Sequence, residues 1–280
     1  MNNALARALL QLAHREDANQ NLLDARDEGS FMATAIVESL SAGQRNAYDA
    51  PHAFEVFIRG GGNPALYDAV SQALASLYGQ HEVRSLLDIG AGDGMALLPA
   101  LARAASRPTR IDVVEPHAGL LDSLRPKLPH DHAWPMTLQT FLSEAAPGHA
   151  WDLAQSTFAL QSIPPMERLD SLRQLRGHVS RLAIVEFDVP EFTSEAERML
   201  SMAQRYERAA QSYGDDAPLV AGGFLAPMLL GQLRATAPSN FEQTISAWHR
   251  ELDDAGYRVK STTHLFDYSW APAWLIVADA

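Results

Sequence analysis

The segment Leu87–Gly94, which reads LDIGAGDG, constrains the fold of this chain more than any other feature of the sequence. It ends a short apolar run that starts at Val83, and a helical pattern follows it from Met95 to Ala105. A glycine loop between a buried strand and a helix is where an open α/β sheet binds its ligand. Glycines there let a bound molecule approach the backbone, because no Cβ intervenes. The segment therefore predicts an α/β domain with a ligand at the carboxyl edge of its first strand.

Strands and helices alternate after this loop. The further strand candidates are Arg110–Pro116, a weak one near Trp134–Leu138, Trp151–Leu160 and Arg181–Val189, with helices through Leu120–Leu124 and Arg168–Leu175. Two last strand-like runs, Tyr257–Trp270 and Ala273–Ala280, are separated by a short Ala-Pro-Ala turn that suggests a hairpin. Such alternation indicates a doubly wound α/β fold whose mostly parallel sheet is covered on both faces.

Helical segments flank this α/β pattern. Residues 1–82 contain three helix candidates, the last of which begins at Asn63-Pro64 with a good N-cap and a favoured first residue. Ser194 and Glu197 form a capping-box pair before a long helix, and Ser239 and Glu242 repeat the signature for a helix that ends at Gly256. We expect an N-terminal helical lid over residues 1–82. A core over residues 83–280 would then carry a helical insertion over about 190–240.

Composition excludes several classes of function. Lys and Arg total 22 against 34 Asp and Glu, so the net charge is −12, which argues against nucleic acid as a partner. The chain has no cysteine, which excludes disulfides, thiolate nucleophiles and cysteine zinc sites, and none of its ten histidines shows a metal-ligand spacing. No apolar run reaches the ~18 residues that span a membrane, and the first residues do not resemble a signal peptide. These features favour a cytoplasmic protein with no membrane partner and no metal.

The spacing of the glycines narrows the choice of ligand. A dinucleotide fingerprint reads G-x-G-x-x-G, but this chain has G-x-G-x-G with Met95 at the third position, and it has no P-loop motif. Glu115 stands 27 residues after Asp88 (115 − 88), at the end of the next strand. A carboxylate there can accept hydrogen bonds from both hydroxyls of a ribose. The pattern predicts a nucleoside-containing cofactor.

Asp88-x-Gly90-x-Gly92-x-Gly94 together with Glu115 resembles the class I S-adenosylmethionine (SAM)-dependent methyltransferases, over roughly Val83 to Ala280. The resemblance implies a seven-stranded sheet whose last strand is antiparallel and part of a C-terminal hairpin. It also implies SAM as the cofactor. The residues that it assigns to SAM are the loop Gly90, Ala91, Gly92 and Gly94, the ribose-binding Glu115 with its neighbour Pro116, and Asp88 at the methionyl ammonium.

The adenine contacts depart from the family pattern. The family often has an acidic residue after the third strand, where this chain has Thr137–Phe141. Gln139 or Thr140 can donate or accept there instead, and Phe141 can stack on the base.

Four candidate residues lie outside the motif. Arg59 and Gly60 belong to a triple-glycine segment that reads either as a lid, with Arg59 on the methionyl carboxylate, or as a plain hinge with Arg59 in a surface ion pair. Tyr67 and Ser156 are candidates beside the reacting methyl. The alternatives are that Tyr67 belongs to the core and that Ser156 only caps its strand.

The function expected from this resemblance is SAM-dependent methylation of a small molecule. We expect a role in biosynthesis, with secondary metabolism as the first choice. The alternatives are intramolecular cyclisation of SAM with release of methylthioadenosine, as in azetidine-2-carboxylate synthesis, methylation of protein or RNA, and a non-catalytic SAM-binding module. The expected partner is a small-molecule substrate, and a homodimer is possible.

Overall fold

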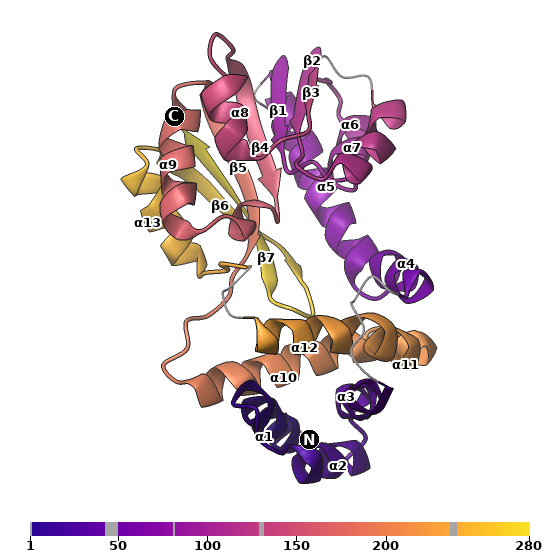
Figure 1. Cartoon of the computed structure of the whole chain (residues 1–280). Coiled ribbons are helices and arrows are strands. Elements are labelled where there is room, and N and C mark those ends of the chain that lie inside the picture. Colours follow the sequence, from indigo (N-terminus) through magenta and orange to yellow (C-terminus); the bar gives the residue numbers. More distant parts are fainter. Residues whose placement is uncertain (1, 43–49, 81, 129–131, 236–239) are drawn as a thin grey trace. The chain divides into compact units, whose positions relative to one another are not determined.

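The computed structural model describes residues 2–42, 50–80, 82–128, 132–235 and 240–280 (Figure 1). The chain forms two compact units. The helical unit consists of residues 1–64, 191–238 and 268–271, and the sheet unit consists of residues 65–190, 239–267 and 272–280. Each unit is therefore built from segments that lie far apart in the sequence.

The sheet unit contains a seven-stranded sheet with the order β3-β2-β1-β4-β5-β7-β6. The strands are β1 (Ser85–Ile89), β2 (Arg110–Val114), β3 (His132–Trp134), β4 (Trp151–Thr157), β5 (Val179–Phe187), β6 (Arg258–Asp267) and β7 (Pro272–Asp279). Strands β1 to β5 are parallel, and β7 runs antiparallel to both β5 and β6. The predicted mostly parallel sheet with a C-terminal antiparallel hairpin is confirmed.

Helices cover this sheet because their apolar sides pack on its buried strands. They are α5 (Asn63–Gln80), α6 (Leu97–Arg103), α7 (Ala118–Leu124), α8 (Leu138–Glu144), α9 (Pro165–Arg176) and α13 (Ile245–Asp254). Phe141 of α8, Leu172 of α9 and Trp248 of α13 are completely buried in one apolar cluster with Leu182 and Ile276 from the strands. This packing fixes the carboxyl edge of the parallel strands, where the glycine loop lies.

Helix α5 belongs to the sheet unit from Ala65 onward, so the division of the chain differs from the boundary expected at residue 82. Two hydrogen bonds join α5 to the sheet unit. Ser71 donates to the carbonyl of Ala96, and the buried Tyr78 hydroxyl donates to Gln155 of β4 at 2.7 Å. These contacts tie α5 to the sheet rather than to the preceding helices.

The helical unit joins the N-terminal helices and the segment after β5 in one core. Its helices are α1 (Asn2–Ala13), α2 (Asn19–Asp27), α3 (Phe31–Ala42), α4 (Pro51–Arg59), α10 (Glu195–Gln211), α11 (Ala217–Val220) and α12 (Ala226–Arg234), with a π-helical turn at Ala221–Leu225. Buried Glu207 of α10 accepts hydrogen bonds from Ser30 Oγ and the Met32 amide at the start of α3. The two segments are therefore interdependent.

The helix starts show which capping signals were informative. Ser194 accepts from the Glu197 amide as the capping box predicts, and the Glu197 carboxylate accepts from Thr193. The helix expected after Ser239 begins instead at Ile245, because Thr244 accepts from the Ala247 amide. Ser239 itself lies outside the described residues.

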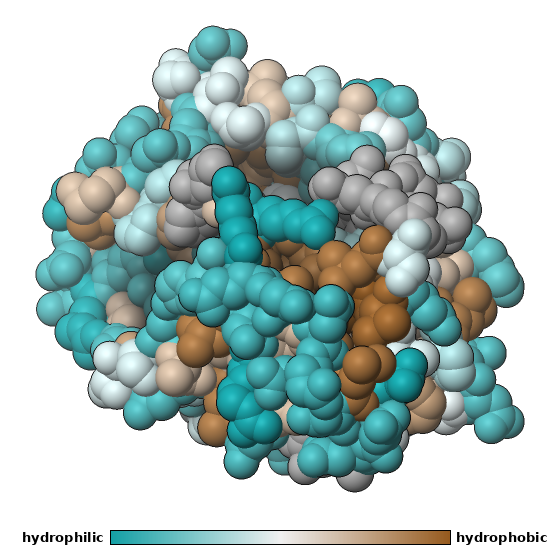
Figure 2. Space-filling model, turned by 60° about the horizontal axis from the view of Figure 1, so that its bottom comes forward, coloured by the Kyte–Doolittle hydropathy of each residue, from teal (hydrophilic) through white to brown (hydrophobic). Residues whose placement is uncertain are grey.

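Apolar surface is limited on the face shown in Figure 2, which is mostly hydrophilic with apolar side chains gathered in one area. In the described part of the chain, the helical run Gly214–Arg234 is long and apolar enough by composition to cross a membrane. Half of its most apolar 18-residue stretch is buried within the structure. One such run is weak evidence for a membrane span, because the core helix of a soluble protein passes the same test.

Candidate functional site

The loop after β1 turns sharply toward the end of β2. The Gly90 amide donates to the Val114 carbonyl at 2.8 Å, and the Gly94 amide donates to the Ala91 carbonyl at 3.0 Å. Gly90, Gly92 and Gly94 all have positive φ values, of 71°, 57° and 89°. A Cβ makes this left-handed conformation costly, so the alternation of glycines is a requirement of the turn itself.

The three glycines have different surroundings. A Cβ on Gly90 would collide with the Ala159 side chain, and a Cβ on Gly94 would meet Leu124 Cδ1 at 2.7 Å. A Cβ on Gly92 would meet nothing within 4 Å. Gly90 and Gly94 are therefore needed for packing, whereas Gly92 faces open space that a ligand can occupy.

Glu115 follows β2 and is nearly buried, at 6% exposure. One carboxylate oxygen accepts from the Gly92 amide at 2.9 Å, and the other accepts from the His117 amide at 2.8 Å. A carboxylate has about four acceptor positions, so each oxygen keeps capacity for one more donor. The two backbone bonds hold the group in a fixed orientation, as recognition of a vicinal diol requires.

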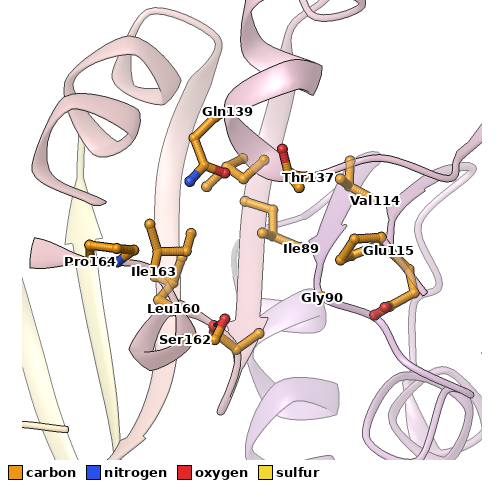
Figure 3. Close-up of a pocket in the computed structure, with 13 residues that line it drawn as sticks. Ile89, Gly90, Val114, Glu115, Thr137, Gln139, Leu160, Ser162, Ile163 and Pro164 are labelled. Atoms are coloured by element: carbon orange, nitrogen blue, oxygen red, sulfur yellow. Dashed lines mark hydrogen bonds between the residues drawn. The ribbon is translucent and has the colours of Figure 1, made fainter. Parts of the chain in front are cut away.

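A cavity of about 280 Å³ lies beside this carboxylate, entirely within the sheet unit (Figure 3). Four stretches of chain line it: the end of β1, the end of β2, the start of α8, and the segment after β4. The lining residues are Ile89, Gly90, Val114, Glu115, Pro116, Thr137, Leu138, Gln139, Ala159, Leu160, Ser162, Ile163 and Pro164. Figure 3 shows Glu115 on one side of the view, Ile163 and Pro164 on the other, and Gln139 between them at the top.

Asp88 lies at 3% exposure near the end of β1. Burial raises the pKa of its carboxyl to about 7, the Gln155 side-chain amide opposes this rise, and the negative charge of Glu115 adds to it. Two carboxyl groups in a poorly hydrated region disfavour each other's charge. A cationic group bound beside them would relieve that cost, so this environment suits an ammonium.

The residues predicted at the adenine divide into two groups. Gln139 lines the cavity, as does Thr137, for which no adenine contact was expected, and the Gln139 side-chain amide donates to Glu167 at 3.2 Å. Thr140 does not line it, because its amide and hydroxyl bond to Thr137, which caps α8. Phe141 is completely buried and packs on Trp134 and Trp151. The expectation that Phe141 stacks on the base is therefore wrong, since its ring points into the core.

Ser156 and Tyr67 also differ from one another. Ser156 is completely buried, and its hydroxyl donates to the Ile89 carbonyl at 3.0 Å, so it braces β4 against β1, as the strand-cap alternative expects. Tyr67 is half-buried on α5 and meets the Phe158 ring edge-on, with ring centroids 6.3 Å apart. Burial, with a contribution from the charge of Asp93, raises the pKa of Tyr67. Only Tyr67 retains a place where it can contact a ligand.

The triple-glycine segment lies in the helical unit. Arg59 is 75% exposed and pairs with Glu55 on the same helix at 2.9 Å, as the surface-pair alternative expects. A Cβ on Gly60 or on Gly61 would meet the Tyr213 ring at 3.2 or 2.7 Å. These glycines thus let the backbone pack on Tyr213, which favours a packed turn over a free hinge. A role of Arg59 and Gly60 in cofactor binding stays a prediction.

Sequence reasoning missed the segment after β4 as a cavity wall. Leu160, Ser162, Ile163 and Pro164 line the cavity opposite Glu115. The available signal was position, because chain that follows the carboxyl end of a central parallel strand lies at the ligand edge. The fully buried Arg168, four residues later, gave no signal.

Comparisons bear on the fold. No protein-family model and no curated protein matches the chain. The solved structure of mitomycin 7-O-methyltransferase MmcR aligns with a TM-score of 0.52 at 17% identity, over 95% of this chain and 76% of that one. A putative O-methyltransferase from Nostoc punctiforme aligns with a TM-score of 0.50 at 15% identity, over 89% and 69% of the two chains.

A third likeness is to the magnesium protoporphyrin IX methyltransferase ChlM from Synechocystis with bound S-adenosylhomocysteine (SAH), with a TM-score of 0.47 and 13% identity over 78% and 84% of the two chains. The strand order with its reversed β7, together with the likenesses to MmcR and the Nostoc protein, shows that this chain has the fold of the class I SAM-dependent methyltransferases.

Proposed function

We propose that this protein is a SAM-dependent methyltransferase that acts on a small molecule. The observation that carries the proposal is the oriented Glu115 carboxylate, which two backbone amides hold at the rim of a cavity beside the glycine loop. Fold alone does not establish activity, so the proposal stands on this site. The neighbours support it, since MmcR is by its name a methyltransferase of a small molecule.

The residues present fit SAM in charge and in shape. The cavity of about 280 Å³ is close to the lower end of ligand pockets, roughly 300 Å³, as a nucleoside half requires. Glu115 would hold the ribose hydroxyls, Gln139 and Thr137 would face the base, and Asp88 would face the methionyl ammonium. Gly92 leaves open space beside Glu115 that a side chain would otherwise fill.

The chemistry that SAM supplies when bound is an electrophilic methyl group on a sulfonium. The protein must orient the acceptor in line with that methyl and keep water out, and a base is needed only for an acceptor that loses a proton. Tyr67 is our candidate for contact with the acceptor, since it is half-buried beside the loop residue Asp93.

The proposal is tested by incubating the purified protein with SAM and a panel of small hydroxylated and amino acceptors, followed by chromatography of the products. SAH formation that depends on an acceptor is the expected result, and the Glu115→Ala variant should lose it. Methylthioadenosine without any acceptor would indicate cyclisation instead. Binding of SAM with no turnover of any acceptor would support a non-catalytic module.

A further inference from the structure

Arg168 lies in the first turn of α9 and is completely buried. Its Nε and Nη2 donate to the two oxygens of Glu251 on α13, both at 2.8 Å. The guanidinium also lies over the Trp248 ring, 4.3 Å from its centroid. A buried charge needs such partners, so these contacts alone read as an internal ion pair.

The third guanidinium nitrogen of Arg168, Nη1, makes contacts that an internal ion pair with Glu251 does not require. Nη1 points at backbone carbonyl oxygens, those of Leu160 at 3.4 Å, Ile163 at 3.3 Å and Phe241 at 3.3 Å. Leu160 and Ile163 line the cavity opposite Glu115. Arg168 thus bonds both ends of the short turn that forms this wall.

The wall combines short local bonds with bonds to distant segments. Residues Leu160–Ser162 form one 3-10 turn, which the Ser162 and Ile163 amides close by donating to the Ala159 and Leu160 carbonyls. The Gln161 carbonyl accepts from the Phe241 amide at 2.7 Å, so Phe241 is bonded to the wall through its amide and to Arg168 through its carbonyl. Gln243 in turn donates to Glu251 at 2.6 Å.

We infer that Arg168 is a positioning residue for the nucleoside half of the ligand: by bonding the Leu160 and Ile163 carbonyls, it sets the wall of the cavity that faces Glu115. This inference rests on the proposed function for the identity of the ligand. It assigns Arg168 no contact with that ligand, because its side chain is completely buried behind the wall.

The test separates an effect of Arg168 on ligand affinity from an effect on the stability of the fold. The double variant Arg168→Met/Glu251→Met replaces the ion pair with apolar side chains, an exchange that buried pairs often tolerate without loss of stability. The Ile163 and Phe241 carbonyls then lose their Arg168 donor, and the Leu160 carbonyl keeps the Ile163 amide as its donor. We expect an unfolding midpoint close to wild type, with affinity for both adenosine and SAM lower by about fivefold or more.

The matched control is Trp248→Phe, which perturbs the same buried cluster but keeps every hydrogen bond of Arg168. It should lower the unfolding midpoint and leave both affinities unchanged. Wild-type affinity in the double variant would overturn the inference, and so would a loss for SAM without a loss for adenosine. If the double variant is unstable, Arg168→Lys serves instead, since one ammonium cannot replace the planar donor fork.

Hydrogen exchange makes the inference independent of the proposed function. In the ligand-free double variant, amides in segments 159–164 and 240–244 should exchange faster than in wild type, while those of the central strands keep their protection. Unchanged exchange in both segments would overturn the role of Arg168. A wild-type protein that binds neither adenosine nor SAM would instead overturn the proposed function.

Discussion

At the residue scale, the candidate site depends on two carboxyl groups whose positions are fixed by backbone hydrogen bonds and by burial. Glu115 is oriented by the Gly92 and His117 amides, and Asp88 is kept in a poorly hydrated position at the end of β1. The cost of these buried carboxyls is measurable without any ligand.

Burial raises the pKa of Asp88 to about 7, so the folded protein keeps this carboxyl neutral at pH values where the unfolded chain ionises it. The ligand-free protein should therefore lose stability as pH rises from about 4 to about 7 and lose no more above that range from this group. Asp88→Asn removes this contribution. We expect the variant to gain at least about 1 kcal/mol relative to wild type across that window.

Urea unfolding of both proteins at several pH values checks this. The comparison must be made as a difference, because burial also raises the pKa of Glu186 to about 8 and gives a slope of the same sign in both proteins. Stability curves that stay parallel from pH 4 to pH 8 would show that Asp88 is ionised in the folded protein.

The loop glycines should respond differently to alanine. Gly92→Ala places a methyl in open space at a positive φ, which costs about 1–2 kcal/mol but leaves the packing intact, so the variant should fold and bind SAM poorly. Gly90→Ala places a methyl against Ala159 and should destabilise the protein more strongly. Thermal unfolding with and without SAM measures both effects. A Gly92→Ala variant with wild-type SAM affinity would mean that the open space is not a ligand site.

Residue-scale prediction from sequence placed the glycine loop and Glu115 together where the signal was local, and their contact with SAM stays a prediction. The glycine alternation and Glu115 could be found because one short loop and one strand end carry the whole pattern. The stacking role of Phe141 and the catalytic role of Ser156 do not match their complete burial, because a sequence shows that a residue lies near a strand end but not whether its side chain turns to the core. Arg168 could not be found, since its partners Glu251 and Phe241 are distant in sequence.

At the element scale, the helical unit depends on close contact between α4 and the π-helical turn. A Cβ on Gly223 would collide with Ala53, whereas a Cβ on the adjacent Gly222 would meet nothing within 4 Å. The turn therefore needs glycine at one position and only tolerates it at the other. Phe224, in the same turn, packs on Phe57 with ring centroids 4.2 Å apart.

These neighbours form a matched pair of variants. Gly223→Ala should destabilise the helical unit, because neither methyl can move without shifting a helix. Gly222→Ala should be neutral or stabilising by up to about 1 kcal/mol, because alanine favours helix over glycine. Thermal unfolding of the two single variants decides the point, and equal effects would contradict the packing described.

Element prediction was reliable for the long periodic helices and the buried parallel strands, since burial imposes the pattern on the sequence. It was less reliable at element ends. The strand expected near Trp134–Leu138 ends at Trp134, and α8 begins at Leu138, because Thr137 caps that helix. A helix cap can depend on a single hydrogen bond, and several residues near a helix start can provide it, so the sequence alone does not fix where the helix begins.

At the scale of the whole molecule, the helical unit is interleaved with the sheet unit along the chain. Its core joins side chains of the first 42 residues, such as Leu9 and Ile36, with side chains after β5, such as Met199 and Leu229. Sequence reasoning found both helical regions but could not join them, because nothing local marks contacts across about 170 residues or more, as between Ser30 and Glu207. A lid role for residues 1–82 stays a prediction.

Deletion of residues 1–62 tests this interdependence. The truncated chain would keep α10 to α12 but lose the partners of their buried apolar face. We expect it to aggregate and to bind a dye for exposed apolar surface, instead of yielding an intact sheet unit. The single variant Arg59→Ala should stay monodisperse, since that side chain is exposed. A monomeric, dye-negative deletion variant by size-exclusion chromatography would contradict the shared core.

The central claim is that the fixed carboxylate of Glu115 holds the ribose of SAM, and calorimetric titration of SAM into wild type and Glu115→Ala tests it most directly. Hydrogen bonds to charged groups contribute about 1.5–3 kcal/mol, so the variant should bind SAM at least about tenfold more weakly while keeping its far-ultraviolet circular dichroism spectrum. Equal SAM affinity in the two folded proteins, or no SAM binding by wild type, would contradict the account.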